Sequence, residues 1–134
     1  QFHLLISRIK KKEDIQSFIN AAIKEGEVDI KNATELTKKL TELFDSTDYT
    51  SLFINKIDVI NEQAILIDST TTLRPDKIIL KKSETVIIDY KTGIPNQKDQ
   101  KQVNTYKQVL EEMGYPKVIC YLFYSSINEL RLVS

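Results

Sequence analysis

The sequence has little of what covalent or metal-based cross-links require. Its 134 residues contain one cysteine, Cys120, and one histidine, His3. A single cysteine excludes an internal disulfide, a CxxC redox pair, a cysteine-rich zinc site and a four-cysteine iron–sulfur cluster. There are only three glycines and three prolines, and 41% of the residues are hydrophobic. The composition is therefore that of a folded domain rather than of a disordered or collagen-like chain.

An excess of one charge and a long apolar run are also missing. Nineteen basic residues balance nineteen acidic ones, which argues against a protein that holds nucleic acid by bulk positive charge alone. No apolar run approaches the ~18–20 residues of a membrane-spanning helix, so we expect a cytoplasmic protein without a membrane partner. The sequence has no start methionine or signal-peptide pattern and opens on helical residues, Gln1 to His3. We therefore expect a fragment of a longer chain.

The length fits one domain, within which residues 1–55 form a helical N-terminal part. Apolar residues recur there at helical spacing and predict three helices. The second helix begins near Glu13 and ends at Gly26, and Thr34 caps the third. Residues 45–49 are expected to form a loop or short turn. The predicted inward positions are Phe2, Leu5, Ile6, Ile9, Ile15, Phe18, Ile19, Ala22, Ile23, Leu36, Leu40, Leu43 and Phe44.

Residues 56–134 change to the pattern of strands around one helix. We predict strands over 57–68, 73–80, 85–91, 118–124 and 130–133, and a helix over 97–113 that Gly114 ends. The first three strands would form a meander, and the fourth would return to the sheet after the crossover helix. The sequence therefore predicts an α/β domain with a mixed sheet.

Charged residues interrupt strands that should be apolar. Asp89 and Lys91 share one face of their strand because side chains alternate. In a meander, Glu62 and Asp76 can reach the same end of that face. Carboxylates held close together repel each other, and a divalent cation such as Mg²⁺ removes the conflict. The alternative is a sheet face that carries ordinary surface ion pairs.

The helix over 97–113 carries a second polar signal. Its spacing places Gln102 and Tyr106 on one inward stripe with Val109 and Met113. Gln102 would flank the metal end of the sheet, or would be a core amide bonded to a loop. His3 is either an ordinary helical histidine or, if the first helix packs against the acidic end of the sheet, part of the site.

These residues, in this order, resemble the PD-(D/E)XK nuclease superfamily. The closest resemblance is to the RecB/AddA-type nuclease domain at the C-terminus of UvrD-like helicases. The most specific element is Asp89–Tyr90–Lys91–Thr92–Gly93 followed by a Gln–x–x–x–Tyr helix. Segments 59–66, 73–79 and 117–124 also carry the resemblance, which covers most of the chain and is weakest over residues 27–55.

The resemblance implies a restriction-endonuclease-like core of the PD-(D/E)XK type and a set of site residues. The implied catalytic residues are Glu62, Asp76, Asp89 and Lys91. The implied metal ligands are His3, Asp76, Asp89 and the backbone carbonyl of Tyr90, holding Mg²⁺ or Mn²⁺ as a substitute. The residues expected at the nucleic acid are Gln102, Tyr106 and, on the same helix, Lys98. Relatives with an iron–sulfur cluster use four cysteines, so this chain is similar to the cluster-free members.

We therefore expect a metal-dependent DNA nuclease domain, and we favour an exonuclease over an endonuclease. The domain would belong to an ATP-dependent helicase–nuclease of double-strand break repair and recombination. Its DNA would be single-stranded, delivered by helicase domains of the same polypeptide, which a second subunit can join. No P-loop is present within these residues. The alternatives are a free-standing phage- or restriction-type nuclease of the same fold, a catalytically idle DNA-binding or docking module, and an α/β domain with surface ion pairs.

Overall fold

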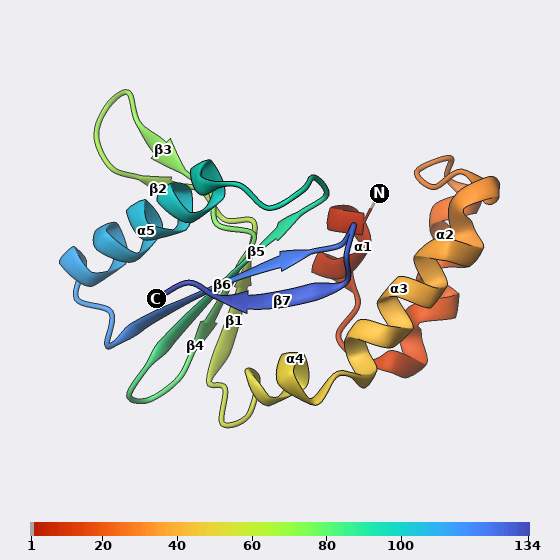
Figure 1. Cartoon of the computed structure of the whole chain (residues 1–134), viewed down its shortest axis with the longest axis horizontal. Helices are drawn as coiled ribbons and strands as arrows, with labels where there is room; N and C mark the ends of the chain where they lie inside the picture. Colours follow the sequence, from red (N-terminus) through yellow and green to blue (C-terminus); the bar gives the residue numbers. More distant parts are fainter. Residues whose placement is uncertain (1) are drawn as a thin grey trace. The chain divides into compact units, whose positions relative to one another are not determined.

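The chain forms two compact units, Gln1–Ser51 and Leu52–Ser134 (Figure 1). The computed structural model describes residues 2–134, except for the side chain of residue 4. The expectation for Gln1 lies outside the described residues. Within them, none of the helices combines the length and the apolar character that crossing a lipid bilayer requires.

The first unit is helical, as the apolar spacing predicts. It consists of α1 (Phe2–Arg8), α2 (Ile15–Lys24), α3 (Ala33–Asp45) and α4 (Thr47–Ser51), with 3-10 turns at Lys12–Asp14 and Ile30–Asn32. Gly26 follows α2 with φ of +75°, a conformation that glycine adopts without steric cost. The stripes of α2 and α3 bury their apolar residues, namely Ile15, Ile19, Ala22, Leu36, Leu40 and Leu43.

Two local predictions for this unit are wrong. Thr34 does not cap α3 but lies inside its first turn, because a 3-10 turn runs directly into the helix. Asp29 caps that turn instead, with its side chain accepting from the N–H of Lys31 at 3.1 Å. The predicted loop over residues 45–49 largely forms α4, in which Tyr49 is buried. A buried tyrosine ring favours order at a place where the local sequence pattern indicates a loop.

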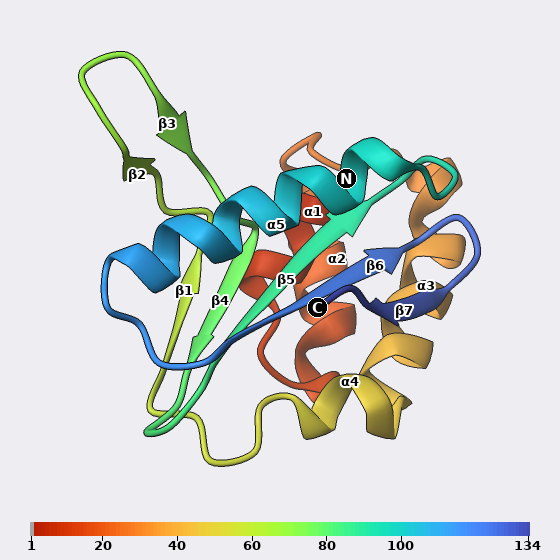
Figure 2. The same ribbon diagram turned by 60° about the vertical axis from the view of Figure 1, so that its left-hand side comes forward.

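The second unit is a mixed α/β structure. Its five-stranded sheet has the order β1-β4-β5-β6-β7, and only β5 and β6 run parallel. The helix α5 (Gln97–Glu112) connects these two strands and crosses one face of the sheet (Figure 2). The strands are β1 (Asp58–Asn61), β4 (Lys77–Leu80), β5 (Thr85–Lys91), β6 (Val118–Tyr124) and β7 (Glu129–Leu132). The predicted meander, crossover helix and returning strand are confirmed.

Two predicted long strands are each divided. The run over 57–68 becomes β1 and the short β2 (Ile65–Leu66), because Glu62 between them has φ of +48°. The run over 73–80 becomes β3 (Thr72–Leu73) and β4, with Pro75 between them. A proline has no N–H to give to a strand ladder. Strands β2 and β3 pair separately as a hairpin, which projects from the sheet in Figure 2.

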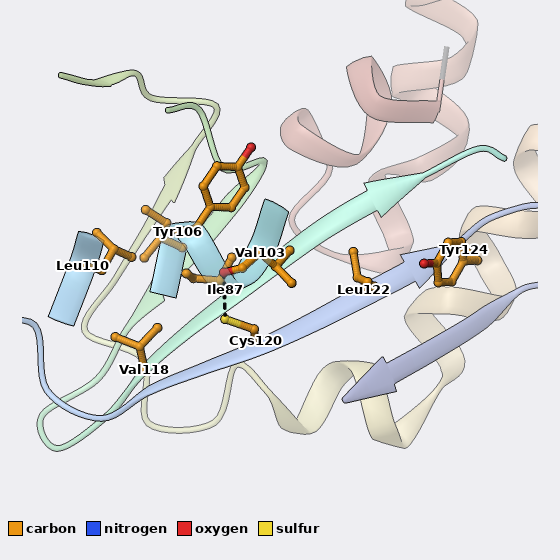
Figure 3. Close-up of a cluster of buried hydrophobic side chains, with 9 residues drawn as sticks. Ile87, Val103, Tyr106, Leu110, Val118, Cys120, Leu122 and Tyr124 are labelled. Carbon is orange, nitrogen blue, oxygen red and sulfur yellow. Dashed lines mark hydrogen bonds between the residues drawn. The ribbon is translucent and has the colours of Figure 1, made fainter. Parts of the chain in front are cut away.

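One cluster of buried residues in this unit lies between α5 and the sheet (Figure 3). The helix contributes Val103, Tyr106 and Leu110, spaced at i, i+3 and i+7. The predicted inward stripe is therefore wrong by part of a turn: Gln102 is exposed and Met113 is 56% exposed. Helical spacing alone allows both stripes, and packing on β5 and β6 selects the one centred on Val103 and Tyr106.

Candidate functional site

The sheet register places Asp76 next to Asp89. Lys77 of β4 pairs with Ile88 of β5, so the residue before β4 lies opposite Asp89. The N–H of Asp76 donates to Oδ1 of Asp89 at 3.3 Å. In return, Oδ2 of Asp76 accepts from the N–H of Tyr90 at 2.8 Å. Each carboxylate is thus held by the main chain of the other strand, and the two predicted acidic residues form a fixed pair.

Asp89 is a buried carboxylate with a strongly shifted pKa. It is only 3% exposed. Burial, with the negative charge of Asp76 as a second cause, raises the pKa of Asp89 to about 6 against the opposing effect of Lys91. Near neutral pH, two like charges are therefore held close together at a buried position, which is the electrostatic situation that a bound cation relieves.

Lys91 links the carboxylate pair to the helix. Its Nζ lies 2.8 Å from Oδ2 of Asp89. The same ammonium donates to Oε1 of Gln102 on α5. The alternation of side chains along β5 accounts for the first contact, and the crossover of α5 over the sheet provides the second. An ammonium with two partners from two elements is held in one place.

Tyr106 borders the same charges from the helix. Burial and then the negative charges of Asp89 and Asp76 raise the pKa of Tyr106 to about 12, against the opposing effect of a hydrogen bond with the side chain of Gln102. Figure 3 shows its hydroxyl directed away from the apolar cluster that holds the ring. The ring of Tyr106 therefore packs in the core, and its neutral hydroxyl lies within the electrostatic influence of the acidic pair.

The structure brings five predicted residues together, and they come from β5, from the residue preceding β4 and from α5. They are Asp76, Asp89, Lys91, Gln102 and Tyr106.

Glu62 reaches the group through its main chain. Its N–H donates to the carbonyl of Asp76 at 2.9 Å, and its own carbonyl accepts from Nε of Arg74 at 2.7 Å. The left-handed backbone at Glu62 takes the residue out of the strand alternation on which its prediction rests. Its role as a catalytic carboxylate stays a prediction.

The remaining predicted residues are distributed around the chain. Lys98 is exposed in the first turn of α5. The ring of Tyr90 is buried edge-on against Phe123, with centroids 6.1 Å apart, so only its main chain is a candidate ligand. His3 lies half-buried in α1 of the first unit. The roles predicted for these residues stay predictions.

The acidic pair is suited to a cation that uses few protein ligands. Within residues 2–134, no cluster of three or more His, Cys, Asp or Glu side chains is arranged for a metal ion. Mg²⁺ commonly takes one or two carboxylates and completes its shell with waters and phosphate oxygens. Asp76 and Asp89 provide two carboxylates whose mutual repulsion a cation would offset, so the residues present fit such an ion.

Comparison with known proteins identifies no relative from which a function could be assigned to these residues. No protein-family model matches the sequence, and no curated protein matches it with significance. The functional assignment therefore depends on the contacts of Asp76, Asp89, Lys91, Gln102 and Tyr106.

Proposed function

We propose that this chain is a metal-dependent nuclease domain of the PD-(D/E)XK type that hydrolyses phosphodiester bonds in DNA. The observation that carries the proposal is the acidic pair Asp76–Asp89 with Lys91 in contact with Asp89. Two carboxylates for a cation, beside one ammonium for an anion, form a charge pattern complementary to a metal-bound phosphate.

The acidic pair would hold Mg²⁺, for which Mn²⁺ can substitute. When bound, such an ion lowers the pKa of a coordinated water and offsets the negative charge of the phosphate. Asp76 and Asp89 are already fixed by main-chain N–H groups of the opposite strand, so little rearrangement is needed to present their oxygens together.

Lys91 would act on the phosphate itself. An ammonium has three donors, and the contacts with Asp89 and Gln102 use two of them. The third can donate to a non-bridging phosphate oxygen, whose negative charge grows in the transition state. Because Asp89 and Gln102 hold the ammonium in place before the substrate arrives, its orientation costs little during the reaction.

The exposed lysines of α5 support nucleic acid as the substrate. Lys98 and Lys101 are exposed in the N-terminal half of this helix, which also carries Gln102. Positive charge beside an acidic metal site attracts the flanking phosphates of a strand whose scissile phosphate lies at the metal. A local basic flank of this kind is compatible with a chain of zero net charge.

The resemblance extends the proposal to the biological setting. In the proposed setting, helicase domains of the same polypeptide separate the duplex, and this domain then degrades the single-stranded DNA exonucleolytically.

The test is a cleavage assay on end-labelled single- and double-stranded DNA with Mg²⁺, Mn²⁺ or a chelator. We expect metal-dependent cleavage by the wild type and a loss of at least about a hundredfold in Lys91→Ala and Asp89→Asn. Lys82→Ala is the matched control, because Lys82 is an exposed lysine in the turn between β4 and β5. Undiminished cleavage in both site variants would refute the proposed site. DNA binding without cleavage would instead indicate an idle binding module.

A further inference from the structure

The contact between Lys91 and Gln102 joins β5 to α5, two elements that a short connection links in the chain. Lys91 is the last residue of β5, and Gln102 lies in the second turn of α5. Residues 92–96 between these elements form a largely exposed loop. Residues at the carboxyl end of β6 form hydrogen bonds with both ends of this connection.

Tyr124 holds the helix. It is the last residue of β6, pairs with Lys91 in the parallel register, and is 1% exposed (Figure 3). Its hydroxyl donates to Oδ2 of Asp99 at 2.9 Å. Asp99 lies one helical turn before Gln102, and its N–H donates to the capping side chain of Asn96 at 3.2 Å. The first turn of α5 is thereby bonded to the sheet beside Lys91.

The two serines that follow hold the strand end and the loop. The N–H of Ser125 donates to the carbonyl of Lys91 at 2.9 Å, and its Oγ lies 3.3 Å from the same oxygen. The Oγ of Ser126 donates to the carbonyl of Gly93 at 3.1 Å. The three consecutive residues 124–126 therefore bond to three points between Lys91 and Gln102. Tyr124 bonds to Asp99, Ser125 to Lys91 and Ser126 to Gly93.

We infer that Tyr124, Ser125 and Ser126 are positioning residues that set the distance between Lys91 and Gln102. This inference deepens the proposed function and rests on it. Tyr124 acts through Asp99 and the helix on Gln102, which orients the ammonium. A hydroxyl on another strand thus controls where the third donor of Lys91 points.

Tyr124→Phe tests the inference with a minimal change, because it removes the hydroxyl and keeps the ring. With labelled single-stranded DNA, we expect kcat to fall on the order of tenfold while KM stays within about twofold. Tyr121→Phe is the matched control, since it removes the same atom from the same strand. It should leave both constants unchanged.

Two further variants separate positioning from general stability. Asp99→Asn keeps an oxygen that accepts from Tyr124 and should retain activity within about threefold, whereas Asp99→Leu should match Tyr124→Phe. In a Gln102→Ala background, Tyr124→Phe should add less than about twofold, because both changes release the same ammonium. Independent, multiplying losses from Gln102→Ala and Tyr124→Phe would overturn the inference, as would an equal loss in Tyr121→Phe.

A second measurement does not require activity. In ¹⁵N-labelled protein, the side-chain amide signal of Gln102 should move in Tyr124→Phe and stay in place in Tyr121→Phe. An unmoved signal in Tyr124→Phe would overturn the positioning role even in an active enzyme. If the wild type fails to cleave DNA, the proposed function is wrong, and the amide signal still decides whether Tyr124 positions Gln102.

Discussion

Asp76 and Asp89 are bonded reciprocally across two antiparallel strands. Asp89 accepts the N–H of Asp76, and Asp76 accepts the N–H of Tyr90, the residue after Asp89. These main-chain donors favour the charged form of each carboxylate, whereas burial and the neighbouring charge disfavour it. At Asp89 the unfavourable effects prevail, and its pKa rises to about 6. The site thus holds charge at a cost in stability. We expect three measurable consequences of this charged pair, and one further consequence of the way in which α5 packs.

The free energy of unfolding should fall as the pH rises through the titration of Asp89. Its pKa is about 6 in the folded protein, against an ordinary value of 3.8, so the folded state binds more protons between these limits. The contribution of Asp89 to the free energy of unfolding is therefore fully present below about pH 4, and it is lost as the pH rises through about 6. In chelator-treated protein at pH 7, Asp89→Asn should be about 1–3 kcal/mol more stable than the wild type in urea unfolding. Asp58→Asn, at an exposed carboxylate of β1, should not reproduce the gain. A less stable Asp89→Asn protein would show that the pair is not strained.

Divalent cations should bind in competition with protons. We expect calorimetric binding of Mn²⁺ at pH 7.5, and about fourfold weaker binding at pH 5.5, because Asp89, with a pKa of about 6, is then mostly protonated and is a poor ligand. Asp76→Ala should remove binding, and Glu112→Gln at the exposed end of α5 should preserve it. Equal affinity in Asp76→Ala would place the cation elsewhere.

The Tyr106 hydroxyl should report on the acidic pair. The wild-type pKa of about 12 includes repulsion from Asp89 and Asp76, so it should fall in Asp89→Asn. NMR titration of ¹³C-labelled tyrosine can resolve this signal among the six tyrosines of the chain. Asp58→Asn, which changes an exposed carboxylate of β1, is the matched control and should leave the Tyr106 signal in place. A Tyr106 pKa that is unchanged in Asp89→Asn would separate the hydroxyl from the acidic pair.

The observed face of α5 should determine which helical residues stabilise the fold. Leu110 is 1% exposed and Met113 is 56% exposed. Leu110→Ala should cost about 2–4 kcal/mol of unfolding free energy, because it leaves a cavity in the core. Met113→Ala should change stability by less than about 0.5 kcal/mol. Comparable losses in chemical denaturation would favour the stripe expected from the sequence instead.

Local periodicity determined most elements of this protein. The segment 85–91 is the strand β5, and 118–124 is β6, with the predicted ends. The shared face of Asp89 and Lys91 also follows from the sequence, because side chains alternate in any strand. These features depend on neighbouring residues only, so the sequence by itself determined them.

Tertiary structure decided how those elements meet. The contact between Asp76 and Asp89 depends on the register of β4 on β5, and the exposure of Gln102 depends on how α5 is rotated by packing. The bond from Tyr124 to Asp99 spans 25 positions and leaves no local pattern. Strand and helix periods specify which residues share a face, but not which faces touch. Long-range packing supplies that choice, and the five grouped residues of the candidate site are its result.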